Sequence, residues 1–575
     1  MAPGCARWRL WRPGIGGARR LAGALLACRT ASGCASVAGD PAAARHALAA
    51  LYRWGQPDPP VVHLAAGVRH ADAVRPGLSA VATLKHETAP GGLSWERFAW
   101  WGVWLLALYR LGVILWGDIP VDVEEAYYLS WARHLDWGYF SKPPLLTAVL
   151  AATTGLLGDS PAVIKSLAVL CYSGAALFVY AIGARLYDPR TGAWAAIAFQ
   201  AMPIVGVLSL FVSTDAPLML FWAAVLYGFV RASESDSPGW WLFTGVMAGL
   251  GLLSKYTIGA LAVGLALYVL LEPQARRLLR SPGLWVGVLV ALLVWSPNLW
   301  WLAQHHWVTL DHTRHITLEI QRAGDWGNLG EFLLGQLGAF GPLLGLVALY
   351  WIWRGEVWHR RADRLLLSAS LPLLILVSYQ AWRHEANLNW ASPAYVGLVL
   401  VATHWMLTHA RRLFYAAVGL NLLLLSGLYH YHALADLFDV RLTRSTDPYF
   451  KRLGWAEIGR QLADLRRRYP RAALLSDSRK LLALLGYHAR VDGQPPVLRS
   501  WNPQGRWRHQ YDLYDDIAAH RDRDYLFVSR RPLGDEVLGR FERARLVAVL
   551  RARIYPDLVR RVYVYHLQGF RGYRR

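Results

Sequence analysis

Residues 98–117 read "FAWWGVWLLALYRLGVILWG", an apolar run that contains a single charged side chain. A run of about 20 apolar residues is long enough to cross the hydrocarbon core of a bilayer as one helix. Blocks of similar character follow as far as His432, without the alternation of apolar and polar residues typical of soluble proteins. The chain is 55% hydrophobic, only 17% charged, and carries 29 Trp. These features indicate an integral membrane protein.

The candidate spans follow one another closely, and most have the length that a membrane-crossing helix requires. They are 98–117, 161–184, 190–211, 214–231, 240–254, 256–271, 283–303, 329–353, 365–382, 390–408 and 412–432. The predicted fold is an α-helical multi-pass membrane protein with about eleven transmembrane helices. The apolar segment 144–158 is shorter, and we interpret it as a re-entrant or interfacial helix outside this series.

Basic residues occur in alternate loops between these spans. They are Arg185, Arg190, Arg231, Arg276, Arg277, Arg280, Arg354, Arg360, Arg361, Arg364, Arg411 and Arg412. If the first span runs from inside to outside, all of these loops are cytoplasmic, as the positive-inside rule requires. The acidic loop after the first span, "VSTDAP", "SKYT", the 304–328 loop and "RHEANLNW" then lie on the outer side. The N-terminus is therefore predicted inside and the C-terminal region outside.

Composition divides the chain into three parts. Residues 1–95 are rich in Ala, Arg, Gly and Pro and lack periodicity, which predicts a disordered extension or a start codon placed too far upstream. Residues 96–432 form the predicted membrane domain, with a first outer loop over 118–160. Residues 433–575 combine an amphipathic stretch with short strand-like runs, which predicts a small extramembrane α/β domain.

The net charge of +22 gathers in the N-terminal region and the C-terminal quarter. This distribution favours contact with anionic lipid surfaces, and no motif predicts nucleic-acid binding. The four cysteines (Cys5, Cys28, Cys34 and Cys171) show no spacing typical of a metal site or a disulfide framework.

The first outer loop concentrates polar groups in the stretch "VDVEEAYYLSWARHLDWGYFSKPPLL", residues 121–146. Asp122 followed three residues later by Glu125 has the pattern of a capping box at the start of a helix. Glu124 then has no structural role, at the positive end of a helix dipole that favours its ionised form. Glu124 is therefore our candidate general base, with Asp122 and Glu125 as alternatives.

Three cations accompany this loop on the predicted outer side: Lys142 in "GYFSKPP", Lys255 in "LLSKYT" and Arg383 in "WRHEANLNW". A carboxylate that faces several cations suits a transferase with a phosphorylated lipid substrate. The base deprotonates an acceptor while the cations stabilise the departing phosphate. We interpret Lys165, by contrast, as a side chain that extends to the lipid headgroups.

The loop resembles the first outer loop of bacterial glycosyltransferases of the GT-C superfamily. More narrowly, it is similar to relatives of the protein O-mannosyltransferases and of the lipid A aminoarabinose and galacturonic acid transferases. The likeness continues through "STDAPLMLFWA", "GLGLLSKYT", "SPNLWWLAQHHWVTLDHT", "GQLGAFGPLL", "NLNWASPAY", "SDSRKLLALLGYH" and "QYDLYDD". It covers nearly all of residues 98–530.

This resemblance implies a polyprenyl (undecaprenyl) phosphate-sugar donor, a periplasmic active site in the bacterial inner membrane, and inversion at the anomeric carbon. The family's catalytic carboxylate falls on Glu124, where the usual residue is Asp, and Glu125 takes the place of the neighbouring acid. Lys142 falls on a contact to the carrier phosphate. Ser141 stands where the aminoarabinose enzymes carry a metal-associated acid, so no metal site of that kind is predicted.

Several further residues are candidates for the sugar pocket: Tyr128, Tyr139, Asp215, His305, His306, Asn387 and Asn389. Asp215 has an alternative role as the N-cap of the fourth span. Because adjacent residues point to different sides of a helix, at most one of His305 and His306 is expected to face the site.

The basic outer domain suits an anionic acceptor such as lipid A or lipopolysaccharide. We therefore expect a membrane glycosyltransferase whose partners are the lipid-linked donor, an anionic glycolipid and membrane lipids. A protein O-glycosyltransferase of the same family is the alternative within the enzyme class. A lipid-linked sugar flippase, a glycan ligase and a non-enzymatic assembly protein are alternatives outside it, and the carboxylates clustered in one loop disfavour all three.

Overall fold

The computed structural model describes residues 92–117, 119–315, 324–520 and 524–573. Nearly all of the predicted N-terminal extension lies outside the described residues, together with three of the four cysteines. The fourth, Cys171, is a buried free thiol.

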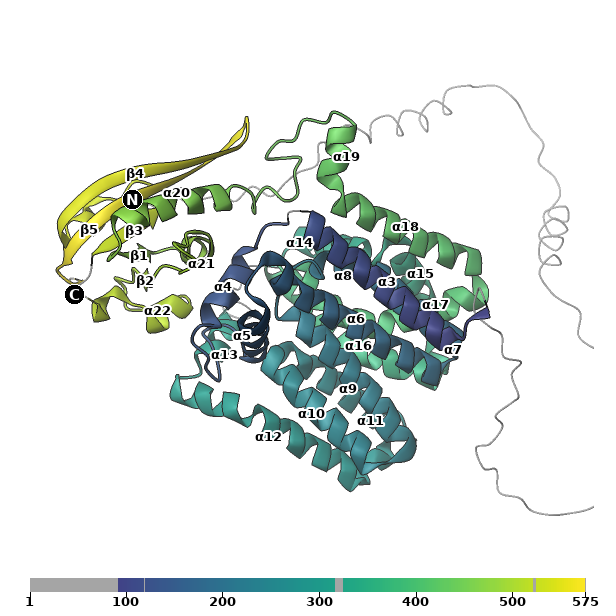
Figure 1. Ribbon diagram of the computed structural model, residues 1–575. Coiled ribbons are helices and arrows are strands. Elements are labelled where there is room, and N and C mark those ends of the chain that lie inside the picture. Colours follow the sequence, from purple (N-terminus) through teal and green to yellow (C-terminus); the bar gives the residue numbers. More distant parts are fainter. Residues whose placement is uncertain (1–91, 118, 316–323, 521–523, 574–575) are drawn as a thin grey trace, which may run out of the picture. The chain divides into compact units, whose positions relative to one another are not determined.

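Each predicted apolar segment forms helix, as Figure 1 shows. The helices of this part are α3 (Trp95–Trp116), α4 (Val123–Trp131), α5 (Leu145–Leu157), α6 (Pro161–Leu186), α7 (Pro189–Ala201), α8 (Pro203–Leu208), α9 (Asp215–Ser235), α10 (Pro238–Ser254), α11 (Gly259–Leu271), α12 (Pro282–Gln304), α13 (Val308–Arg314), α14 (Trp326–Phe340), α15 (Pro342–Arg354), α16 (Arg361–Arg383), α17 (Tyr395–His409) and α18 (Arg411–Tyr429). Short 3₁₀ turns occur at Tyr256–Ile258, Arg276–Arg280, Glu356–His359 and Leu388–Ala394.

The multi-pass helical fold is confirmed, but the predicted number of spans is not. Within the described residues, 7 helices are long and apolar enough to cross a membrane, or 8 if the bent pair α14–α15 forms one span. The difference arises partly because α10 has only 17 residues and α11 only 13. The interfacial segment predicted at 144–158 is the short apolar helix α5.

Two predicted spans are broken in the structure. The segment predicted over 329–353 bends by 111° between α14 and α15. At the bend Gly341 has a φ of +108°, and a Cβ added there would lie 2.2 Å from Nδ2 of Asn421. Only glycine tolerates this conformation and this close approach. The segment predicted over 190–211 is divided before Pro203, whose ring cannot continue a helix.

Local sequence sets where several helices begin. The side chains of Ser94, Ser160 and Asp188 each accept a hydrogen bond from a backbone N–H of the first turn of α3, α6 and α7. These are ordinary N-caps, each replacing a bond that the helix end lacks. α6 and α7 then pack closely because a Cβ added at Gly183 would lie 2.6 Å from the Cα atom of Gly192.

The C-terminal part forms the predicted small α/β domain. Its elements are α19 (Tyr431–Leu437), α20 (Trp455–Arg468), β1 (Ala473–Ser476), α21 (Arg479–His488), β2 (Leu498–Ser500), α22 (Gln510–Tyr514), a 3₁₀ turn (Ile517–Ala519), β3 (Tyr525–Ser529), α23 (Asp535–Leu538), β4 (Phe541–Tyr555) and β5 (Leu558–Phe570). The sheet order is β2-β1-β3-β5-β4. β1 is parallel to β2 and β3, whereas β5 is antiparallel to β3 and β4. The sequence did not predict β2, which has only three residues.

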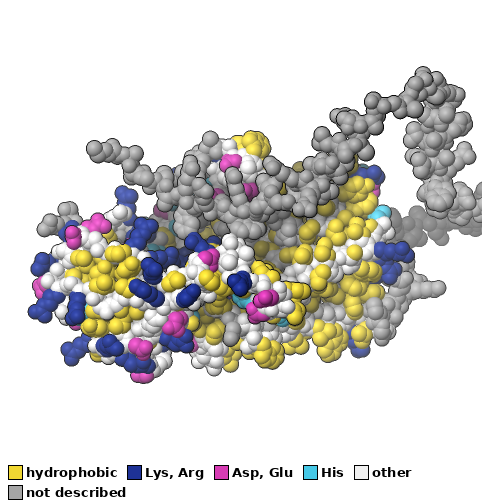
Figure 2. Space-filling model, turned by 90° about the horizontal axis from the view of Figure 1, so that it is seen from above, with side chains coloured by type: hydrophobic (Ala, Val, Ile, Leu, Met, Phe, Trp, Pro, Cys, Tyr) yellow, Lys and Arg dark blue, Asp and Glu magenta, His cyan; other side chains and the backbone are white. Residues whose placement is uncertain are grey.

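The two parts of the described chain differ in surface chemistry. Figure 2 shows Lys and Arg side chains gathered over the C-terminal domain, whereas hydrophobic side chains dominate the flank of the membrane helices. Large aromatic side chains such as Trp300 and Trp353 are 68% and 81% exposed on that flank. Exposure of this kind is expected where lipid replaces water around the protein.

Candidate active site

A cavity of about 670 Å³ lies where the ends of several membrane helices meet the C-terminal domain. We call it the polar cavity. Its lining residues are Asp122, Glu124, Tyr127, Tyr128, Phe140, Ser141, Lys142, Leu208, Phe211, Val212, Ser213, Thr214, Asp215, Lys255, His312, Asn387, Asn389, Trp390, Arg452, Arg479, Arg508 and His509. Eight predicted site residues are among them: Asp122, Glu124, Tyr128, Lys142, Asp215, Lys255, Asn387 and Asn389.

The start of α4 positions the carboxylates of the first loop. Oδ1 of Asp122 accepts a hydrogen bond from the backbone N–H of Glu124 at 3.1 Å, and Oε2 of Glu125 accepts one from the N–H of Asp122 at 2.8 Å. The predicted capping box is thus confirmed. It places Asp122 and Glu124 on the wall of the polar cavity.

Glu125 lies outside that wall. It is fully buried, its Oε2 lies 2.6 Å from Nζ of Lys165, and its Oε1 accepts a hydrogen bond from the N–H of Val212 at 2.9 Å. The prediction that Lys165 extends to the headgroups is wrong, because this side chain is completely buried. An apolar helix can hold an ammonium group inside the protein when a carboxylate pairs with it. Glu125 and Lys165 therefore join α4 to α6.

Both carboxylates at the cavity wall are paired with arginines that come from far along the chain. Glu124 accepts hydrogen bonds from Nη2 and Nη1 of Arg479 at 2.7 and 3.2 Å. Oδ2 of Asp122 accepts one from Nε of Arg452 at 2.8 Å. Burial alone would raise the pKa of Asp122, but the charge and hydrogen bond of Arg452 outweigh it and hold that pKa below its usual value.

A third carboxylate, Asp215, faces the cavity from the first turn of α9. Its Oδ1 lies 2.6 Å from Nζ of Lys255, and its Oδ2 accepts a hydrogen bond from Asn389 at 2.8 Å. Thr214 occupies the N-cap position of α9, so the alternative role of Asp215 as the N-cap is not adopted. The pair Lys255–Asp215 is thus built into the site.

Lys142 differs from the other cations of the cavity. Within the described part of the chain, its ammonium group has no hydrogen bond or ion pair. Burial lowers the pKa of Lys142 to about 8, and the nearby charge of Lys255 adds to this effect. A cation held without a partner in a polar cavity is suited to bind an anionic group.

Two histidines add hydrogen-bonding groups without charge. Burial lowers the pKa of His312 to about 4, with a contribution from the charge of Lys142. Burial also lowers the pKa of His509 to about 4, although the charge of Asp512 opposes the shift. Both imidazoles are therefore neutral near pH 7. The cationic character of the cavity comes from lysine and arginine.

Four other predicted site residues do not line the polar cavity. Arg383 ends α16, where its guanidinium lies 5.7 Å from the ring centroid of Trp382. Tyr139 is buried and stacks on Trp131, with ring centroids 4.7 Å apart. The side chain of Tyr139 thus shapes the loop before α5.

His305 and His306 are the other two. His305 stacks on Trp301 with ring centroids 4.0 Å apart, and its Nε2 lies 3.3 Å from the hydroxyl of Tyr514. His306 has a φ of +52°, because the chain turns sharply after α12 ends. This turn directs both residues away from the polar cavity, which the sequence did not reveal.

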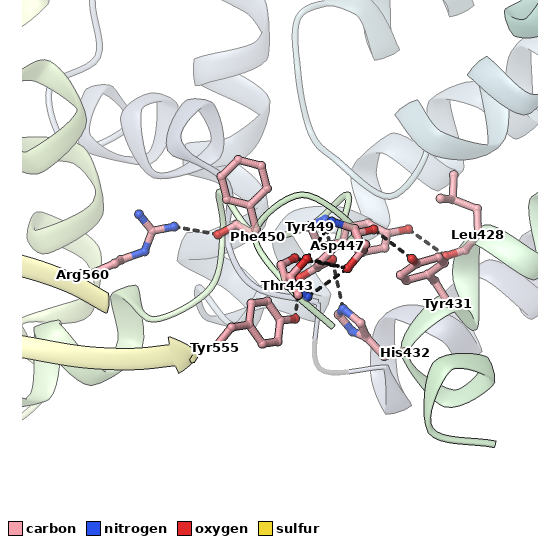
Figure 3. A network of polar contacts seen from close by, with 10 residues as sticks. Leu428, Tyr431, His432, Thr443, Asp447, Tyr449, Phe450, Tyr555 and Arg560 are labelled. Atoms are coloured by element: carbon pink, nitrogen blue, oxygen red, sulfur yellow. Dashed lines mark hydrogen bonds and ion pairs between the residues drawn. The ribbon is translucent and has the colours of Figure 1, made fainter. Parts of the chain in front are cut away.

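Residues 438–454, which we call the strap, connect α19 to α20 and carry Arg452 to the cavity. A buried carboxylate, Asp447, holds the strap in place (Figure 3). It accepts hydrogen bonds from the N–H of Tyr449 and the hydroxyl of Tyr555, both at 2.7 Å. Nε2 of His432 lies 3.2 Å away. The strap is thereby tied to β4 and to α19.

Arg560 of β5 holds the part of the strap nearest Arg452. Its guanidinium donates hydrogen bonds to the backbone carbonyls of Phe450, Lys451 and Leu453, at 2.7, 3.0 and 2.6 Å. Because these carbonyls flank Arg452 on both sides, the position of Arg452 against Asp122 depends on the C-terminal sheet.

Replacing Asp447 by Ala is expected to destabilise the protein by about 2 kcal/mol, because three polar partners lose their acceptor. Thermal unfolding in detergent would measure the loss. Asp436→Ala is the matched control, since Asp436 is exposed on the neighbouring helix α19. Equal unfolding temperatures for the two variants would contradict the role given to Asp447.

Sequence analysis missed five residues of the cavity wall: His312, Arg452, Arg479, Arg508 and His509. Four of them belong to the C-terminal part of the chain. A signal was present, because the segment "SDSRKLLALLGYH" that carries the family likeness contains Arg479. Its role became visible only once α21 was placed against α4.

The fold and the cavity define an integral membrane glycosyltransferase of the GT-C superfamily. Residues 141–301 match the family described as dolichyl-phosphate-mannose-protein mannosyltransferase. The chain is 32% identical over 437 residues to the lipid A galacturonosyltransferase RgtD of Rhizobium johnstonii, covering 72% of this chain and 89% of that relative. It belongs to the same family as that enzyme.

Two further comparisons agree. The lipopolysaccharide core galacturonosyltransferase RgtB of Rhizobium johnstonii is 24% identical over 407 residues, covering 66% of this chain and 79% of that relative. The crystal structure of ArnT from Cupriavidus metallidurans, bound to undecaprenyl phosphate, superposes with a TM-score of 0.57 at 14% identity. That likeness covers 82% of this chain and 98% of ArnT, and it shows a shared fold.

Proposed function

We propose that this glycosyltransferase transfers a hexuronic acid from a polyprenyl phosphate carrier to lipid A or a related lipopolysaccharide glycolipid. The observation that carries the proposal is Lys142, a cation without a partner in a cavity that also holds paired carboxylates. The names of the relatives support the sugar and the acceptor, since RgtD and RgtB are galacturonosyltransferases of lipid A and the lipopolysaccharide core. The undecaprenyl phosphate bound to ArnT supports the carrier.

The donor phosphate binds to Lys142, with Lys255 beside it. Lys142 supplies a charge that no described residue neutralises, whereas Lys255 shares its charge with Asp215. As the bond between the sugar and the phosphate breaks, negative charge grows on the leaving phosphate. A cation placed to meet that charge stabilises the transition state more than the ground state.

Glu124 is the base of the reaction. An acceptor hydroxyl attacks the anomeric carbon from the face opposite the phosphate and forms the new glycosidic bond. The bond from the anomeric carbon to the phosphate oxygen breaks, the carrier phosphate leaves with the electron pair, and Glu124 takes the hydroxyl proton. The Arg479 pair holds the Glu124 carboxylate in place, and a carboxylate retains further lone pairs for the acceptor.

The acceptor approaches from the side of the C-terminal domain. Residues 96–432 form the catalytic membrane domain and residues 433–575 the periplasmic domain, with the N-terminus in the cytoplasm of a bacterial inner membrane. The distribution of basic loops supports this orientation. The basic side chains over the C-terminal domain in Figure 2 favour an anionic glycolipid, and Arg508 offers a cation for the sugar carboxylate.

Mass spectrometry of lipid A and core glycolipids tests the proposal in a strain that lacks the gene. The wild-type chain should restore the mass of one hexuronic acid residue, and Lys142→Ala should not. Lys451→Ala is the matched control, because Lys451 is exposed and lies outside the cavity lining. An unchanged glycolipid profile on deletion would contradict the proposed acceptor, and full restoration by Lys142→Ala would contradict the phosphate site.

The pKa of Lys142 predicts a pH dependence. In the free enzyme Lys142 loses its proton as the pH rises through about 8. The donor phosphate binds the charged form, so the KM for the donor should stay constant below pH 8 and rise above it. Lys142→Arg should remove the rise, because an arginine stays charged in this range. Steady-state kinetics from pH 6.5 to 9.5 provide the measurement, and the same rise in both proteins would contradict the assignment.

A further inference from the structure

A second cavity, of about 420 Å³, lies within the membrane part of the protein among α9, α10, α11 and α12. These helices lie side by side in Figure 1. Thr244 apart, the lining side chains are apolar, and many are small. The α11 residue Ala266 and the α12 residue Trp285 are exposed at its edges, so the cavity opens towards the surrounding lipid. We call it the apolar groove.

The groove follows one face of α10 to the polar cavity. Its α10 residues include Trp241, Gly245, Ala248 and Leu252, which recur at helical spacing and form one stripe. Lys255, three residues beyond Leu252, continues the stripe and lines the polar cavity. The stripe covers about 21 Å, most of the thickness of about 30 Å of a bilayer core. A long apolar site therefore ends beside a cation of the active site.

Glycines fix the depth of the groove. A Cβ added at Gly245 would lie 2.3 Å from the carbonyl oxygen of Gly287, so α10 and α12 are in close contact at its floor. Near its outer end the situation is the opposite, because a Cβ added at Gly259 would meet nothing within 4 Å. The floor is closely packed, whereas the end beside Lys255 has space for a ligand.

We propose that the apolar groove binds the isoprenoid chain of the sugar carrier. The inference rests on the proposed function, because it assigns the tail of the donor whose phosphate lies at Lys142 and Lys255. A carrier has a charged head joined to a long apolar chain, and the groove and the cavity offer these two environments in the same order. Within a bilayer the chain gains packing contacts and no hydrophobic transfer energy. The groove therefore aligns the donor and selects for chain length.

A bulky side chain placed in the groove provides the test. Ala266→Trp fills it from α11, and Leu267→Trp is the matched control, because Leu267 is exposed to lipid on the same helix outside the lining. Gly259→Phe is a second filling variant in case Ala266→Trp does not fold. Each purified enzyme is assayed with an undecaprenyl phosphate donor and with a donor shortened to a few isoprene units.

The wild-type enzyme should have a lower KM for the long donor than for the short one. Filling the groove should raise the KM for the long donor about three- to tenfold, which corresponds to ~0.7–1.4 kcal/mol of lost packing, and leave the short donor unchanged. Leu267→Trp should keep the wild-type ratio. Equal effects on both donors, or none, would overturn the proposal and show that ordinary lipids fill the groove. A wild-type enzyme inactive with both donors would instead refute the proposed function.

Discussion

Replacing Glu124 by Gln is expected to lower kcat by about 100- to 10,000-fold, the usual contribution of a general base. The amide keeps the size of the side chain and can still contact Arg479, but it cannot take the proton of the acceptor hydroxyl. Because the Glu124 side chain is 41% exposed, the variant should unfold close to the wild-type temperature. Initial rates of sugar transfer by the purified enzyme, at saturating donor and acceptor, give the measurement.

Two controls sharpen this experiment. Glu457→Gln changes an exposed glutamate of α20 that is also paired with an arginine, Arg460, and its rate should match the wild type. Binding of undecaprenyl phosphate to Glu124→Gln should be retained, because Lys142 is intact. A rate within a few-fold of the wild type for Glu124→Gln would remove it as the base. Asp122 would then be the remaining carboxylate of the first loop on the cavity wall.

Replacing Lys165 by Met is expected to destabilise the folded protein by about 3–5 kcal/mol, because it leaves the buried Glu125 carboxylate without its counter-charge. Unfolding in detergent micelles, followed by tryptophan fluorescence, would measure the loss. The double variant Glu125→Gln, Lys165→Met should recover much of it, since no unpaired charge then remains.

A surface pair provides the comparison. Arg185 and Glu234 lie 2.7 Å apart with side chains 49% and 39% exposed, so Arg185→Met should cost no more than about 1 kcal/mol. If Lys165→Met and Arg185→Met cost the same, the buried pair does not join α4 to α6 as described. If Lys165→Met instead lowers the rate of a fully stable enzyme, Glu125 belongs to the catalytic machinery.

The sequence predicted those features that depend on neighbouring residues. Apolar runs located the helices, because a membrane requires such runs wherever a helix crosses it. The capping box at Asp122 and Glu125 was readable for the same reason, since its two hydrogen bonds join residues three positions apart. Lys142 and Lys255 were found because each lies in a short polar motif between apolar segments.

Features that depend on distant partners were not predictable in this way. Lys165 in an apolar helix gives no sign of whether it faces lipid or Glu125, and the two are 40 positions apart. The bend at Gly341 depends on Asn421, which belongs to another helix. Arg383 was placed by the end of its helix, but the end of a helix does not fix the direction of a side chain at the bundle surface.

The two arginine pairs also determine when the enzyme becomes active during its synthesis. Asp122 and Glu124 leave the ribosome early, whereas Arg452 and Arg479 follow 330 and 355 positions later. The first loop must therefore cross the membrane and wait for the C-terminal domain to be translated and translocated before its carboxylates are in position. A nascent or truncated chain is inserted in the membrane but inert, so the cell exposes no half-built transferase to its pool of lipid-linked sugar.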